Sequence, residues 1–297
     1  MSESVASLRH KISSAEELES VVRTMKAMAA SSISQYENAV RSLDDYYRTV
    51  QLGLAACFRE NRSPGVIPPL KKHQQIPIAA IVFGSDQGLV GQFNEIMVEY
   101  AVDALQKQPG KKTVWAVGAR IHSRLTDIGL QPLGGFALPG SINAIAPLIG
   151  DILIELEARR EQGLIEQVYL FNHHPVSGAV YTPVSQQLLP LDQSWLLHLS
   201  EIPWPTQNLP EVIGRREQTL SALVREYLFV TLFRACAESL ASENASRLAA
   251  MQRAEKNIDE LQNDLNRSYH RLRQNGIDEE LFDVFSGFEA LKNEAGL

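Results

Sequence analysis

The segment GSDQGLVGQFN, residues 84–94, has the composition most suggestive of chemistry in this chain. It follows a short apolar run, so we expect it where a strand turns into a helix, a position at which α/β folds often bind phosphate groups. However, it lacks the Lys-Ser/Thr of a P-loop, its glycines follow GxxxGxxG rather than GxGxxG, and Asp86 stands where an anion would bind. We therefore interpret it as a tight turn that needs its glycines, with a phosphate site as the alternative.

Two adjacent histidines, His173 and His174, raise the question of a metal site. Neighbouring side chains on an extended segment point to opposite faces, and no carboxylate or cysteine lies at ligand spacing. A turn before Pro175 is the interpretation that we favour. The sequence has no Gly-x-Ser-x-Gly, no HExxH and no Cys/His pairing in a catalytic context. It therefore predicts no catalytic residue, no cofactor site and no metal site.

Composition narrows the class of protein. The chain has 297 residues, of which 44% are hydrophobic and 21% charged, as in soluble proteins large enough to form a core. A net charge of -7 argues against a nucleic-acid binder. Cys57 and Cys236 form no CxxC motif, which favours a reducing cytosolic compartment, with a disulfide between them as the alternative. We find neither a secretory signal nor an 18-residue apolar run, so we expect no segment to cross a bilayer.

The middle of the chain predicts a compact α/β domain. Apolar runs of strand length alternate with segments of helical spacing, which indicates a mostly parallel sheet with helices packed against it. We expect strands over 78–84, 113–118, 166–174 and 179–191, and helices over 94–107, 119–129 and 142–163. Asn94 and Ser141 are the expected N-caps of the first and third of these helices.

Both ends of the chain predict long helices. Apolar positions recur about every 3.5 residues, which is coiled-coil spacing. In the first helix these are Leu8, Ile12, Ala15, Val22, Met25, Ala29, Tyr36, Leu43, Val50 and Leu54, and in the second they are Leu240, Leu248, Met251, Ala254, Ile258, Leu261, Leu265, Ser268 and Leu272.

The length of these helices exceeds what the middle domain can enclose. Helices over about 3–59 and 210–274 would be roughly 85 and 100 Å long at about 1.5 Å per residue. A domain of about 150 residues has a radius of gyration of only about 15 Å. We therefore expect the paired helices to project, and we divide the chain into an N-terminal coiled-coil helix at 1–60, an α/β domain at 61–209 and a C-terminal coiled-coil helix at 210–297.

Three segments carry a resemblance to a known family. The segment 8–33, LRHKISSAEELESVVRTMKAMAASSI, resembles the amino-terminal helix of the γ subunit of F-type ATP synthases. The segment 85–94 is similar to that family's Ser-Asp-x-Gly-Leu-x-Gly-x-x-Asn turn. The segment 238–281, from ESLASENASRL to NGIDEEL, resembles its carboxy-terminal helix without a gap. The three occur in the family's order over nearly the whole chain.

The sequence also departs from the family pattern at several places. Glu16-Glu17 replaces the usual Asn-Thr, Val22-Arg23 replaces Thr-Lys, and Gly287-Phe288 replaces Gly-Ala. The segment 277–280 reads Ile-Asp-Glu-Glu in place of Ile-Thr-x-Glu. These differences leave the resemblance intact and favour a divergent or duplicated member of the family, for example one from an alternative F-type complex.

The resemblance implies both a fold and a function. The terminal helices would wind into a long antiparallel coiled coil, and the middle would form a small Rossmann-like α/β domain. Such a protein is the central-stalk rotor that couples ion flow through the membrane sector to ATP synthesis or hydrolysis. Its implied partners are the F1 α and β subunits, the ε subunit and the membrane c ring. It would do no bond chemistry, insert no segment into the membrane, and lie on the cytoplasmic face of the bacterial inner membrane.

The resemblance also assigns candidate contacts between rotor and stator. Seven residues match family positions that face the stator, and for each of them coil packing or a solvated charge is the alternative. Those matching the segment that faces a moving loop of β are Arg23, Met25 and Lys26, and those matching the segment near the upper end of the shaft are Arg273, Gln274, Glu280 and Asp283.

Two other functions fit parts of the pattern. A free-standing coiled-coil adaptor with an α/β head would show the same periodicity without a rotary partner, and the identity of neighbouring genes distinguishes it. An enzyme with an α/β catalytic domain ranks third. A nucleotide-dependent thermal shift would favour the enzyme, because a specific ligand stabilises the folded state.

Overall fold

The computed structural model describes residues 4–59, 76–176, 179–191, 195, 197, 199, 201–208 and 210–294. Two compact units make up the chain. We call residues 1–28 with 248–297 the coil unit and residues 29–247 the sheet unit. The described helices include none that is long and apolar enough to span a membrane.

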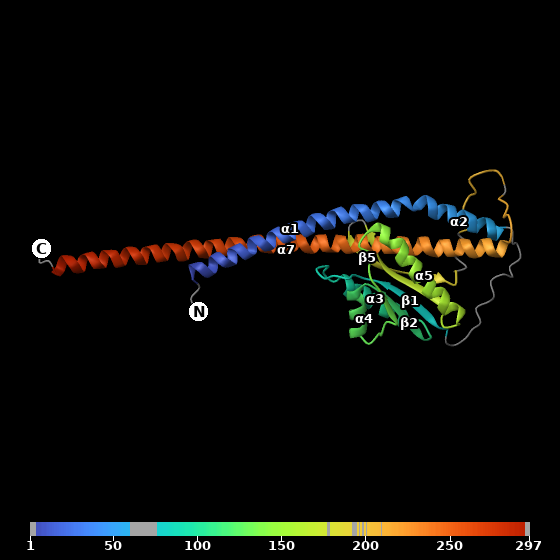
Figure 1. Cartoon of the computed structure of the whole chain (residues 1–297), viewed down its shortest axis with the longest axis horizontal. Helices are drawn as coiled ribbons and strands as arrows, with labels where there is room; N and C mark the ends of the chain where they lie inside the picture. The colour runs from blue at the N-terminus through green and yellow to red at the C-terminus, as the bar shows by residue number, and fades with distance from the viewer. Residues whose placement is uncertain are drawn as a thin grey trace. The chain divides into compact units, whose positions relative to one another are not determined.

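Three helices account for the two ends of the chain (Figure 1): α1 (Val5–Ser42), α2 (Asp44–Arg59) and α7 (Arg216–Glu294). The single helix expected over about 3–59 is therefore wrong, because the chain turns at Leu43, whose N–H bonds to the Val40 carbonyl at 3.1 Å. Asp44 and Asp45 then lie in the first turn of α2, where the helix dipole favours acidic side chains.

The last helix also differs from its expected bounds of about 210–274. It begins after Gly214, whose φ of 95° is unfavourable for other residues. It continues through Asn275 and Gly276 to Glu294. A guanidinium N–H of Arg216, in its first turn, donates to the Cys57 carbonyl near the end of α2.

The sheet unit contains a five-stranded sheet in the order β3-β2-β1-β4-β5. Its strands are β1 (Ile78–Phe83), β2 (Lys112–Val117), β3 (Gly134–Phe136), β4 (Gln167–Val176) and β5 (Ala179–Leu189). Strands β3, β2, β1 and β4 pair in parallel, and β5 pairs antiparallel to β4. The mostly parallel sheet is therefore confirmed, whereas β3 was not expected.

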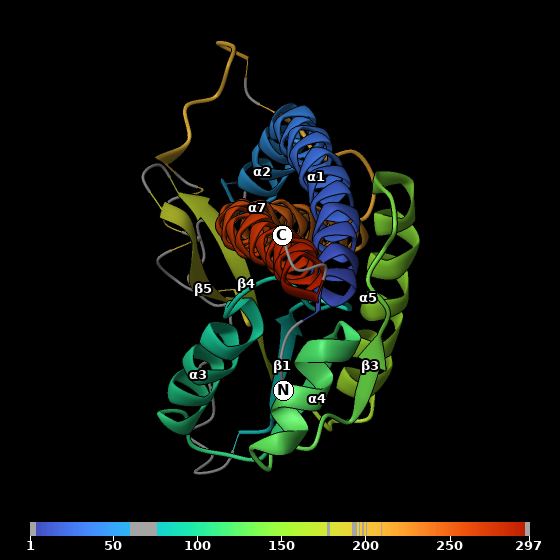
Figure 2. The same cartoon turned by 90° about the vertical axis from the view of Figure 1, so that its left-hand side faces the viewer.

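Helices cover both faces of this sheet (Figure 2). The short helices are α3 (Phe93–Gln106), α4 (Ala119–Asp127), the 3-10 turn η1 (Ile142–Ala144) and α5 (Ile145–Glu161). On one face Ile78, Ala80 and Val82 of β1 pack with α3 and α4. On the other face the alternate side chains of β1 pack with α2, α5 and α7. Because β1 is buried on both faces, it reads as a continuous apolar run.

The coil unit confirms part of the expected apolar seam, the stripe of inward-facing residues along which α1 and α7 pack. Leu8 and Ala15 of α1 and Met251 of α7 are buried, and Ile258 is half-buried. Leu261 is 49% exposed, so its assignment to the seam is wrong. Its neighbour Gln262 takes the inward position instead, because its side-chain amide donates to Glu19 Oε2 at 3.1 Å.

Two local predictions in the sheet unit are wrong, and a third is confirmed only in position. Asn94 does not cap α3, whose N-cap is Gln92. Ser141 is the N-cap residue of η1, as expected, but its side chain makes no capping hydrogen bond. Pro175 lies within β4 and follows no turn. The sulfurs of Cys57 and Cys236 are buried and are not joined in a disulfide.

Candidate functional site

The loop after β1 is a tight turn whose backbone requires glycine. A Cβ added at Gly84 would lie 2.2 Å from the Ile121 Cβ, too close for any other residue. Leu89 and Gly91 have φ angles of 61° and 60°, in the left-handed region that glycine adopts most easily. The interpretation of this segment as a turn that needs glycine is confirmed at Gly84.

A pair of buried polar side chains closes the turn. The Ser85 N–H donates to Asn94 Oδ1 at 2.9 Å, and the Asn94 amide donates back to Ser85 Oγ at 2.8 Å. Ser85 Oγ in turn donates to the Gln87 carbonyl at 2.9 Å. Because both partners are buried, each bond also satisfies a polar group that would otherwise be costly to desolvate.

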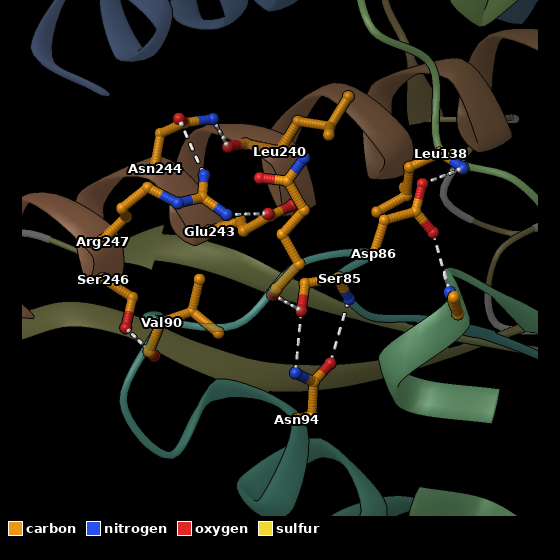
Figure 3. A network of polar contacts seen from close by, with 12 residues as sticks. Ser85, Asp86, Val90, Asn94, Leu138, Leu240, Glu243, Asn244, Ser246 and Arg247 are labelled. Atoms are coloured by element: carbon orange, nitrogen blue, oxygen red, sulfur yellow. Dashed lines mark hydrogen bonds and ion pairs between the residues drawn. The ribbon is translucent and has the colours of Figure 1, made fainter. Parts of the chain in front are cut away.

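Asp86 supplies the anion for the start of α4. Its carboxylate accepts the Ala119 N–H at 2.7 Å and the Leu138 N–H at 3.1 Å (Figure 3). Backbone N–H groups at a helix N-terminus are the groups that bind phosphate in many α/β proteins. Here a side chain of the protein occupies that position, which favours the structural role of the turn over a phosphate site.

The turn is attached to α7 within the sheet unit. Ser246 Oγ donates to the Val90 carbonyl at 2.6 Å. The next residue, Arg247, forms an ion pair with Glu243, one turn earlier on α7, at 2.6 Å, with 14% and 7% of the two side chains exposed. Arg247 also donates to Asn244 Oδ1 at 3.2 Å. Figure 3 shows this network facing the loop that carries Ser85 and Val90.

Burial dominates the electrostatics of Glu243. Loss of solvent raises the pKa of its carboxyl, and Arg247 opposes that rise by attracting the ionised form. Asp86 contributes a smaller upward effect on the same pKa. The Arg247–Glu243 ion pair is thus desolvated, and Arg247 is the group that favours the ionised form of Glu243.

The two histidines point to opposite faces of β4, as expected. His173 is fully buried with Nε2 2.9 Å from the Phe93 carbonyl, and burial lowers its pKa to about 4, so it is neutral at neutral pH. His174 is 46% exposed, with Nδ1 2.8 Å from a carboxylate oxygen of Glu238. Glu238 also accepts a hydrogen bond from Arg234 at 2.8 Å. Within the described part of the chain, no cluster of three or more His, Cys, Asp or Glu residues could hold a metal ion.

The expected rotor-stator residues lie in the coil unit, in two groups. Arg23 is exposed and paired with Glu19, Met25 is half-buried, and Lys26 Nζ lies 2.5 Å from Glu255 Oε2. The second group, all exposed, is Arg273, Gln274, Glu280 and Asp283.

The two groups lie at different heights along the coil. Arg9, in the second turn of α1, donates to the Tyr269 hydroxyl at 3.0 Å, whereas Lys26 meets Glu255. The register of these pairs and of Gln262 with Glu19 places Arg273 and Gln274 opposite the first turn of α1, and Glu280 and Asp283 beyond the start of that helix. The sequence interpretation missed Glu19, Glu255 and Gln262, although each stands four residues after an apolar coil position and so could have been placed inward.

Comparisons with known proteins decide the family. A family model described as ATP synthase matches residues 4–291. The ATP synthase gamma chain of Dechloromonas aromatica is 26% identical over 301 residues, which cover 96% of this chain and 98% of the relative. The chain belongs to the ATP synthase γ-chain family.

Solved structures of ATP synthase rotors share the γ-chain fold. One chain of the Euglena gracilis mitochondrial ATP synthase, in a structure of OSCP, F1 and c-ring, has a TM-score of 0.69 and 15% identity. The match covers 99% of this chain and 96% of that one. A rotor chain of the same Euglena enzyme has a TM-score of 0.64 and 15% identity, covering 92% and 98%. The expected fold, two long terminal helices with an α/β domain, is confirmed.

Proposed function

We propose that this chain is the central-stalk rotor of an F-type ATP synthase and couples ion flow through the membrane sector to ATP synthesis or hydrolysis. The observation that carries the proposal is the family match over residues 4–291, because it includes both coil helices and the sheet unit. In this proposal segments 1–60 and 210–297 form the shaft, and segment 61–209 forms the α/β domain. The chain itself catalyses no reaction.

The proposed partners are the F1 α and β subunits, the ε subunit and the c ring. One of the similar Euglena structures contains F1 and c-ring, which supports the first and last of these. Rotation of the shaft would present different sides to each β subunit and bias its affinity for nucleotide, a coupling between distant sites. The complex would place this chain at the cytoplasmic face of the bacterial inner membrane.

The exposed side chains at the end of α7 support the proposal that a partner protein encloses this helix. Beyond Tyr269 its side chains are largely exposed, and several of them are large and apolar. Ile277, Leu281, Phe282, Val284 and Phe285 are between 54% and 73% exposed. Contiguous exposed apolar surface is uncommon in proteins that act alone and marks interaction sites. We propose that the ring of F1 α and β subunits covers this surface. The seven rotor-stator residues named above are its proposed contacts on this chain.

Copurification tests this proposal. We expect the tagged full-length chain to retain the α and β subunits encoded by the same organism. Replacing both Leu281 and Phe285 by lysine should reduce the retained α and β several-fold, because two charges would have to enter an apolar contact. The matched control combines Asn275→Lys with Glu279→Gln, which adds the same charge at exposed polar positions and should retain both subunits. Failure of the unaltered chain to retain either subunit would refute the proposal.

A further inference from the structure

Within the coil unit, the apolar contacts between α1 and α7 do not by themselves fix the register. In the coil unit Leu8, Ala15 and Val22 follow one another at intervals of seven residues and are buried or half-buried. Met251, Ile258, Leu265 and Leu272 form the matching series on α7, also at intervals of seven. If one helix slid past the other by seven residues, about 10 Å, apolar side chains would again face apolar side chains. These contacts alone therefore permit several registers.

A second column of inward positions is mostly polar. It lies four residues after each apolar position and consists of Ile12, Glu19 and Lys26 on α1 and of Glu255, Gln262 and Tyr269 on α7. Each polar member makes a contact across the coil. Lys26 Nζ lies 2.5 Å from Glu255 Oε2, the Gln262 amide donates to Glu19 Oε2 at 3.1 Å, and Arg9 donates to the Tyr269 hydroxyl at 3.0 Å. The partner numbers rise along α1 as they fall along α7, so the pairing is antiparallel.

The charged members of this column discriminate between registers. A slip of seven residues in one direction would bring Glu19 opposite Glu255 and Lys26 opposite Leu248. A slip in the other direction would bring Lys26 opposite Gln262 and leave Glu255 without its cation. Only 36% of the Lys26 side chain and 24% of the Glu255 side chain is exposed, so an unpaired charge at either position would be partly desolvated.

We propose that the polar column selects the register of this coil, and that the Lys26–Glu255 pair is its main determinant. Polar residues at inward positions are known to specify register in coiled coils at some cost in stability. Lys26 thereby becomes a positioning residue of the shaft, in addition to any contact with the stator. The register is a property of the chain alone, whereas its effect on coupling rests on the proposed function, because only a coil of fixed register transmits torque without slipping.

Spin-label distances in the full-length chain test the register. Labels on Ser13→Cys and Arg253→Cys occupy exposed positions at different heights of the coil, and Cys57 and Cys236 are buried. A slip of seven residues would change the distance between the labels by several ångströms, because it moves the helices about 10 Å along each other.

We expect one narrow distance in the unaltered coil and a second distance after Lys26→Glu, which places like charges together. Glu255→Gln, a neutral change of similar volume, should broaden the distribution. The exchanged pair, Lys26→Glu with Glu255→Lys, should restore the single distance. Lys256→Glu is the matched control, because that side chain is 78% exposed and its ion pair with Glu260 lies on one helix.

A single unchanged distance after Lys26→Glu, or a second distance that the exchanged pair retains, would overturn the inference. The same variants incorporated into membrane vesicles report on coupling. The ratio of ions moved to ATP hydrolysed should fall for Lys26→Glu and recover in the exchanged pair. If the distances behave as expected while the chain fails to join an ATPase, the register stands and the proposed function fails.

Discussion

Replacing Arg247 by alanine is expected to lower the free energy of unfolding of the sheet unit by about 3 to 5 kcal/mol, the usual cost of removing one partner from a buried ion pair. The change leaves Glu243 desolvated, with only 7% of its side chain exposed. Chemical denaturation of the full-length chain, followed by circular dichroism, measures the loss.

The pH dependence of the Arg247→Ala variant follows from the same burial. Burial raises the pKa of Glu243, and removal of Arg247 takes away the charge that opposes this rise. A carboxyl with a raised pKa in the folded state binds more protons there than in the unfolded state. The deficit in stability should therefore be largest at neutral pH and shrink as the pH falls and Glu243 becomes protonated.

Arg225→Ala is the matched control for this variant. Arg225 lies on the same helix and pairs with Glu157 at 3.2 Å, but 57% and 43% of the two side chains are exposed. Exposed pairs contribute about 0 to 1 kcal/mol, so this change should have little effect. Equal losses for the two variants would contradict the assignment of Arg247 and Glu243 as a desolvated pair that supports the junction between α7 and the turn.

Replacing Ile258 by aspartate should open the coil and uncouple ATP hydrolysis from ion movement. Ile258 lies in the apolar column of α7, so the change removes an apolar contact and partly desolvates a carboxylate, at a cost above about 2 kcal/mol. In membrane vesicles we expect the ratio of ions moved to ATP hydrolysed to fall several-fold.

Leu261→Asp provides the control for the coil. It introduces the same charge three residues along α7, where the leucine is 49% exposed and outside the seam. We expect this variant to keep most of its coupling. If Leu261→Asp uncouples the complex as strongly as Ile258→Asp, the packing of the coil described above is wrong.

The coil shows what periodicity can and cannot predict. Spacing near 3.5 identified both helices and the apolar column, because burial of one stripe is what the sequence encodes most plainly. It placed Leu261 inward and gave no position to Gln262, because apolar periodicity does not detect a cross-coil hydrogen bond such as the one from Gln262 to Glu19. The break at Leu43 was also missed, since apolar spacing continues through it to Val50 and Leu54.

The sheet unit likewise shows which features the local sequence pattern predicts and which depend on tertiary contacts. The strands expected over 78–84, 113–118 and 166–174 occur at 78–83, 112–117 and 167–176, because their apolar runs match buried parallel strands. Residues 134–136, Gly-Gly-Phe, form a three-residue edge strand that was not predicted, because glycine is depleted in strands. Asn94 resembles an N-cap in sequence, but its side-chain amide forms hydrogen bonds with Ser85 instead. Local sequence does not reveal this contact.

Part of the network in Figure 3 could be predicted from the sequence. Glu243 and Arg247 stand four residues apart, the spacing of ion pairs on one helix face. Their burial was not predictable, because it depends on the loop around Val90 lying against α7. The position of Asp86 at an anion site was recognised, but its two N–H partners come from distant segments.

Direct observation of rotation tests the central claim most sharply. A probe attached through Lys107→Cys, an exposed position just after α3, would report movement of this chain in complexes fixed to a surface through their α and β subunits. Addition of ATP should produce sustained rotation of the probe in one direction. Complexes that hydrolyse ATP while the probe only fluctuates about a fixed angle would show that this chain is not the rotor.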